Sequence, residues 1–85
     1  MTNFICGVDV SATALEARLG RDGPVERFAR NAAGIAALAA FCKQHQVAFV
    51  AMEATGGYEK LPFGLLWAAA VPAAIVNPRA ERANL

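Results

Sequence analysis

The stretch FICGVDV, residues 4–10, is almost continuously apolar and carries one carboxylate, that of Asp9. A run of this kind is typical of a central β-strand that is covered on both faces of its sheet. The stretch VAFVAM, residues 47–52, has the same character and is followed at once by Glu53. The two runs predict two central strands of one sheet, each with an acidic residue at or near its end.

The residues that follow the first run predict a meander of three strands. Residues 14–19 carry apolar side chains at every second position, which indicates a half-solvated antiparallel strand. The short connection at 11–13 makes the first two strands a hairpin. The turn GRDGP at 20–24 then leads into a third strand at 25–30, whose charges are typical of a sheet edge.

Two helices and a last strand are expected in the rest of the chain. Asn31 is a suitable N-cap, and apolar residues recur at helical spacing after it. The break at 55–57 opens a second helix from about Tyr58 to Ala70, followed by a strand at 71–76. Residues 79–85 are expected to begin a further helix. The predicted core includes Leu38, Phe49, Phe63, Trp67 and the thiols of Cys6 and Cys42.

The predicted order of elements is therefore β-β-β-α-β-α-β. Three meandering strands precede two right-handed crossovers, which add parallel strands beside the first. The result is a mixed five-stranded sheet in the order third, second, first, fourth, fifth, with helices on both of its faces. This α/β layout is ribonuclease-H-like, and it accounts for residues 1–85 as one domain.

Composition excludes several classes of protein. Of the 85 residues, 56% are hydrophobic and 18% are charged, which excludes a disordered charged tail. The net charge of +1 does not by itself demand nucleic acid or an anionic membrane, so any phosphate binding has to be local. The two cysteines form no metal-binding pattern, and a reducing, cytoplasmic location is expected. The uncharged run at 61–76 is interrupted by proline and is too short for a membrane span.

Asp9 and Glu53 are the acids whose positions suggest chemistry. Their strands are neighbours in the predicted sheet, so both side chains can meet at one end of it. Two carboxylates held together repel, and a hard divalent cation such as Mg²⁺ removes that cost while bridging to phosphate oxygens. The alternative is structural: Asp9 bonds Ser11 or Thr13 in a turn, and Glu53 caps the next helix.

Three motifs in order carry a resemblance to a known family. They are GVDVS at 7–11, EATGGYE at 53–59 and VNP at 76–78. With them, essentially the whole chain resembles the N-terminal, RuvC-like catalytic domain of the IS110/IS1111-type transposases, whose active site holds an Asp-Glu-Asp-Asp set of acids. The resemblance implies that Asp9 and Glu53 are the first two catalytic acids, that they bind Mg²⁺ or Mn²⁺, and that the substrate is DNA.

The sequence also departs from the family's pattern. Ala12 stands where the family usually has lysine, and the third and fourth acids and a serine-bearing domain lie further along in the family. Residues 1–85 are therefore expected to be a partial catalytic domain, incomplete on its own and associating as a homodimer. Contacts to a DNA phosphate are expected from Ser11, Thr55, Gly56, Gly57 and Tyr58, although the glycines could equally serve a sharp turn and the tyrosine could pack on the sheet.

Two other functions remain open from the residues. A non-catalytic module could use this fold for self-association or for docking on DNA. An actin-like ATPase or sugar-kinase lobe also opens with a strand, an aspartate and a hairpin, but its phosphate hairpin needs glycine for close backbone approach. Residues 10–13 contain none, which disfavours that alternative.

Overall fold

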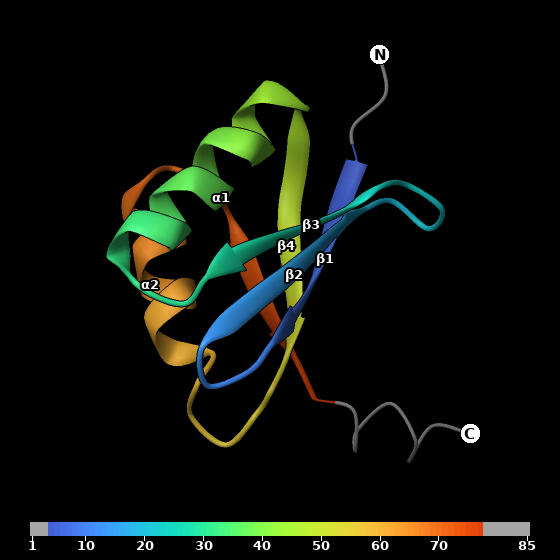
Figure 1. Ribbon diagram of the computed structural model, residues 1–85. Coiled ribbons are helices and arrows are strands. Elements are labelled where there is room, and N and C mark those ends of the chain that lie inside the picture. The colour runs from blue at the N-terminus through green and yellow to red at the C-terminus, as the bar shows by residue number, and fades with distance from the viewer. Residues whose placement is uncertain (1–3, 78–85) are drawn as a thin grey trace, which may run out of the picture.

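The computed structural model describes residues 4–77 and contains five strands and two helices in the predicted order (Figure 1). The strands are β1 (Phe4–Val10), β2 (Ala14–Leu19), β3 (Val25–Ala29), β4 (Val47–Glu53) and β5 (Ala73–Val76), and the helices are α1 (Ala32–Gln44) and α2 (Lys60–Ala68). The turns predicted at 79–85 lie outside the described residues.

All five strands form a single sheet in the order β3-β2-β1-β4-β5, as predicted. β1 pairs antiparallel with β2 and parallel with β4, so it is the central strand. β2 pairs antiparallel with β3, and β4 pairs parallel with β5. The hairpin and the two crossovers inferred from periodicity therefore place the two acid-bearing strands side by side.

Both helices pack on the same face of the sheet, so the expectation of helices on both faces is wrong for the described residues (Figure 1). Along β1 the side chains alternate: Cys6 and Val8 are buried under the helices, whereas Ile5, Gly7 and Asp9 are exposed. Continuous apolar sequence therefore does not mean two covered faces here, because Ile5 stays 48% exposed and Gly7 has no side chain to cover. We call the face opposite the helices the open face.

The core lies between the sheet and the two helices. Leu38 of α1, Leu66 of α2 and Leu15 of β2 are fully buried in it. Cys6 and Cys42 meet there as free thiols, confirming them as core residues, and hydrogen bonding to Cys6 together with burial raises the pKa of the Cys42 thiol. Within residues 4–77, the helices fall short of the length and apolarity that crossing a membrane requires.

Two predicted core residues are placed differently. Trp67 is 51% exposed on α2, where its indole N–H donates a hydrogen bond of 3.0 Å to the carbonyl of Ala73. Phe49 is only half-buried, because it alternates with the buried Val50 and so belongs to the open face. Both positions looked like core because an aromatic residue stood inside an apolar run, and burial in fact follows the side of the element that the residue occupies.

The second helix is shorter than predicted. It begins at Lys60 rather than Tyr58, because Gly56 and Gly57 carry the backbone through positive φ angles of 82° and 133° before the helix can start. It ends at Ala68, and Ala70 follows in the left-handed region with φ 65°. The first helix begins after Asn31, whose side chain accepts a hydrogen bond from the N–H of Gly34, as expected for an N-cap.

Candidate metal and phosphate site

Asp9 and Glu53 lie on the open face at the same end of the sheet. The parallel ladder of β1 and β4 pairs Val8 with Met52, and the two acids are the next residues on each strand. Val8 and Met52 are buried under the helices, so alternation directs Asp9 and Glu53 to the opposite side. The structure thus brings the two predicted acids together on adjacent strands, which lie about 4.8 Å apart in a sheet.

A hollow of about 380 Å³ on the open face contains both acids in its lining. Its floor includes Gly7 and Ala51, the residues that precede the acids on the same face of each strand. A Cβ atom added to Gly7 would meet no other atom within 4 Å, so the space above the strand is open. Arg18 lines the same hollow from β2 and lies directly opposite Gly7.

The surroundings of the two carboxylates fit a hard divalent cation. Ser11 directs its hydroxyl to Ala14 rather than to Asp9, and the N-cap of α2 is Glu59 rather than Glu53. Carboxylate oxygens are the ligands that Mg²⁺ and Mn²⁺ prefer, and an open hollow beside them leaves room for water or substrate oxygens. Among residues 4–77, no group of three or more His, Cys, Asp or Glu side chains is placed to hold a metal ion.

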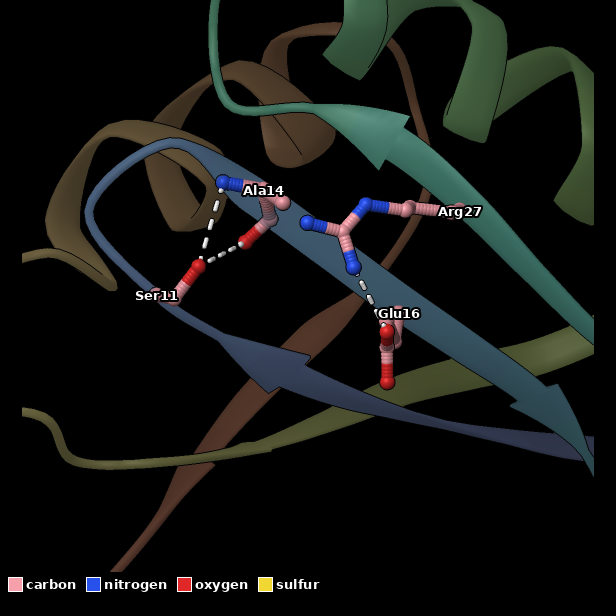
Figure 2. Close-up of polar contacts among 4 residues, drawn as sticks. All are labelled: Ser11, Ala14, Glu16 and Arg27. Carbon is pink, nitrogen blue, oxygen red and sulfur yellow. Dashed lines mark hydrogen bonds and ion pairs between the residues drawn. The ribbon is translucent and has the colours of Figure 1, made fainter.

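Glu16 is an acid of this region that the sequence reasoning missed. It lies directly opposite Asp9 in the β1–β2 ladder and lines the same hollow. Figure 2 shows the carboxylate of Glu16 bound by the guanidinium of Arg27 on β3, at 2.8 Å. The hairpin register, together with the alternation of Leu15 and Ala17, could have identified it, because both put Glu16 on the face of Asp9.

Ser11 closes the turn between β1 and β2. Its N–H donates to the carbonyl of Ala14 at 2.9 Å, and its hydroxyl lies 3.2 Å from both the N–H and the carbonyl oxygen of Ala14 (Figure 2). The residue predicted to contact a DNA phosphate therefore has a structural role in the turn that follows Asp9.

Glu59 organises the loop between β4 and α2. One of its carboxylate oxygens accepts hydrogen bonds from the hydroxyl of Thr55 at 2.6 Å, the N–H of Thr55 at 2.9 Å and the N–H of Gly57 at 3.0 Å. The hydrogen bonds from Thr55 and Gly57 hold the pKa of the Glu59 carboxyl down at about 2. Its side chain is buried, although glutamate is rarely so, because three donors replace its water.

Some of the residues predicted to contact phosphate in this loop already make hydrogen bonds within it. The N–H groups of Thr55 and Gly57 already serve an internal carboxylate, whereas Gly56 and Tyr58 are exposed. Tyr58 is 48% exposed, and the guanidinium of Arg30 lies over its ring, 5.2 Å from the centroid. The glycines thus serve a sharp turn, and Tyr58 carries a cation on one face of its ring.

A family model and a solved structure match the chain. The family model, described as Transposase and of the DEDD IS110 type, matches residues 6–84. RuvC from T. thermophilus, solved in complex with a Holliday junction substrate, is similar with a TM-score of 0.60 and 17% sequence identity. That similarity covers 92% of this chain and 66% of the RuvC chain, and it confirms the ribonuclease-H-like fold. Comparison with curated proteins gives no match.

Proposed function

The chain belongs to the IS110 family of DEDD transposases, and from this membership we propose that it is the N-terminal part of a catalytic domain that recombines DNA by cleaving phosphodiester bonds. The observation that carries the proposal is the placement of Asp9 and Glu53 on adjacent strands, on one face and beside one hollow. We propose that residues 1–85 are part of a RuvC-like domain, which is supported by the similarity covering 66% of the RuvC chain.

Asp9 and Glu53 are proposed to hold Mg²⁺ or Mn²⁺. Such an ion supplies Lewis-acid stabilisation of a phosphodiester oxygen when it is bound. The protein's own part is to fix two carboxylates on a rigid sheet with an open floor at Gly7, so that an extended phosphate backbone can approach closely. Arg18 also lines the hollow, and its guanidinium donates a hydrogen bond of 3.2 Å to the carbonyl of Gly23 in the β2–β3 turn, so its positive charge would meet a phosphate backbone at that end of the hollow.

The residues predicted to contact DNA phosphate lie in two loops, and only the loop after β4 is proposed to contact phosphate directly. In the loop after β4, the N–H of Gly56 and the hydroxyl of Tyr58 are the groups open to a phosphate, whereas Thr55 and Gly57 act through the shape of the loop. Ser11 likewise supports the shape of the β1–β2 turn. DNA as the partner follows from the family, and the net charge of +1 requires that its binding be local.

Titration of the ¹⁵N-labelled 85-residue chain with Mn²⁺ tests the proposal. Amide signals of Asp9 and Glu53 should broaden first, and calorimetry should show binding that disappears in Asp9→Ala. Glu26→Gln is the matched control. Glu26 lies opposite Ala17, whose side chain faces the helices, so Glu26 belongs to the other face of the sheet from Asp9 and Glu53. Broadening spread evenly over the surface acids, or an unchanged isotherm in Asp9→Ala, would overturn the metal assignment.

A further inference from the structure

We propose that Arg30 is a positioning residue that ties together the two loops in which the acid-bearing strands end. The inference rests on the proposed function, because it concerns the placement of Asp9 and Glu53. Arg30 lies between β3 and α1, away from the hollow itself.

The backbone of Arg30 is fixed on both sides. Before it, Ala29 ends β3, and Gly34 of α1 approaches so closely that a Cβ on Gly34 would fall onto the carbonyl of Ala29. After it, Asn31 caps α1 through the N–H of Gly34 at 2.8 Å. Arg30 therefore projects from a rigid junction between the edge of the sheet and the first helix.

From this junction Arg30 reaches both loops. Its Nε donates a hydrogen bond of 2.7 Å to the carbonyl of Ala12, and its backbone N–H donates one of 3.0 Å to the carbonyl of Thr13. Both acceptors belong to the turn that follows Asp9. The same guanidinium lies 5.2 Å from the centroid of the Tyr58 ring, in the loop that follows Glu53.

The acids need such support because they stand at the end of the β1–β4 ladder. The last pair of that ladder is Val8 with Met52, so Asp9 and Glu53 are paired only on their outer sides, with Glu16 of β2 and Val76 of β5, and not with each other. Beyond them, Ser11 tightens one turn and Glu59 tightens the other loop. Each loop is thus internally ordered, and Arg30 joins the two to each other.

The guanidinium suits this role better than an ammonium would. It is planar, so its face can lie over an aromatic ring while an edge donor reaches a carbonyl. Ala12 offers no side chain that could make the link from the other side. Lysine at position 30 would keep the positive charge and lose the fixed geometry.

The test measures Mn²⁺ affinity by broadening of the amide signals at Asp9 and Glu53. Arg30→Met should weaken that affinity about tenfold. This is the low end of the loss in metal affinity that follows when a residue that orients a metal ligand is removed. Arg30→Lys should restore only part of the affinity. In the Arg30→Met background, Tyr58→Ala should cause little further loss of Mn²⁺ affinity, because both substitutions break the same contact between the two loops. Arg21→Met is the control, since Arg21 is exposed in the β2–β3 turn at the far end of the sheet (Figure 1).

A second measurement does not depend on metal. Without any Mn²⁺, Tyr58→Ala should shift the amide signals of Ala12 and Thr13, whereas Tyr58→Phe, which keeps the ring, should leave them in place. Unchanged signals in Tyr58→Ala, or an Arg30→Met chain that binds Mn²⁺ as the unsubstituted chain does, would overturn the inference. Absence of Mn²⁺ broadening in the unsubstituted chain would instead overturn the proposed metal site.

Discussion

Asp9 of β1 lies directly opposite Glu16 of β2 on the open face of the sheet. Glu53 stands on the other side of Asp9, so the central acid is flanked by an acid on each neighbouring strand. Like charges opposite one another destabilise a sheet. The ion pair of Glu16 with Arg27 offsets one of these repulsions, and a bound cation would offset the other.

This arrangement predicts that Asp9→Asn leaves the fold intact and stabilises it slightly in metal-free buffer. Removing one of the flanked charges should raise the free energy of unfolding by up to about 0.5 kcal/mol. Chemical denaturation with and without a chelator measures the change. A clear loss of stability would mean that Asp9 has a structural role in the turn after β1.

Core truncation should separate two residues that looked equivalent in the sequence. Leu38 is fully buried between the sheet and the helices, so Leu38→Ala should cost about 2–5 kcal/mol of unfolding free energy. Phe49 faces the open side and is half-buried, so Phe49→Ala should cost clearly less. Equal losses in urea denaturation would show that the open face is covered in solution.

Glu59 predicts a specific dependence of stability on acid. Its pKa lies at about 2, below the usual value of 4.5, because Thr55 and Gly57 donate hydrogen bonds to the ionised form. The stabilisation from this carboxylate is therefore complete above about pH 4.5 and is lost as the pH falls toward 2. The difference in melting temperature between the unsubstituted chain and Glu59→Gln should be largest at pH 6 and shrink across that window.

A matched substitution separates this effect from general acid unfolding. Glu26 is exposed on β3, so Glu26→Gln should show no comparable pH dependence of its melting temperature. A constant difference between Glu59→Gln and the unsubstituted chain from pH 6 to pH 2 would show that the three hydrogen bonds to Glu59 do not depend on its charge.

The strand order was predictable from the sequence because short turns and alternation leave few topologies for three meandering strands and two crossovers. The side of the sheet that the helices cover was not predictable. Ile5 and Gly7 belong to a continuous apolar run, and that pattern is the same whether their face of the sheet is covered or exposed. Glu59 and Arg30 were missed for a related reason. Their roles depend on contacts with loop backbone, and nothing in their spacing marks them, whereas Asp9 and Glu53 are acids at the ends of apolar runs.

Association is the fourth prediction. The open face and the edge strand β3 expose apolar side chains, among them Ile5 at 48% and Val25 at 47%, and the net charge of +1 opposes association little. We expect a homodimer that covers the open face or pairs β3 strands. Val25→Lys should weaken it in either arrangement, because lysine disfavours both edge pairing and apolar contact. Sedimentation equilibrium showing a monomer at micromolar concentrations would contradict this prediction.

The last prediction concerns catalysis by the 85-residue chain alone. Residues 4–77 bring no more than two acids, Asp9 and Glu53, to the proposed ion, so most of its coordination positions are left to water. Such an ion is held weakly and is poorly fixed relative to a phosphodiester, and misplacement of a reacting group by about 1 Å can cost a hundredfold in rate. Nicking of supercoiled plasmid with Mg²⁺ or Mn²⁺ should therefore be undetectable, even where Mn²⁺ binding is measurable by NMR. Metal-dependent nicking that Glu53→Gln abolishes would show instead that two acids on this sheet are sufficient.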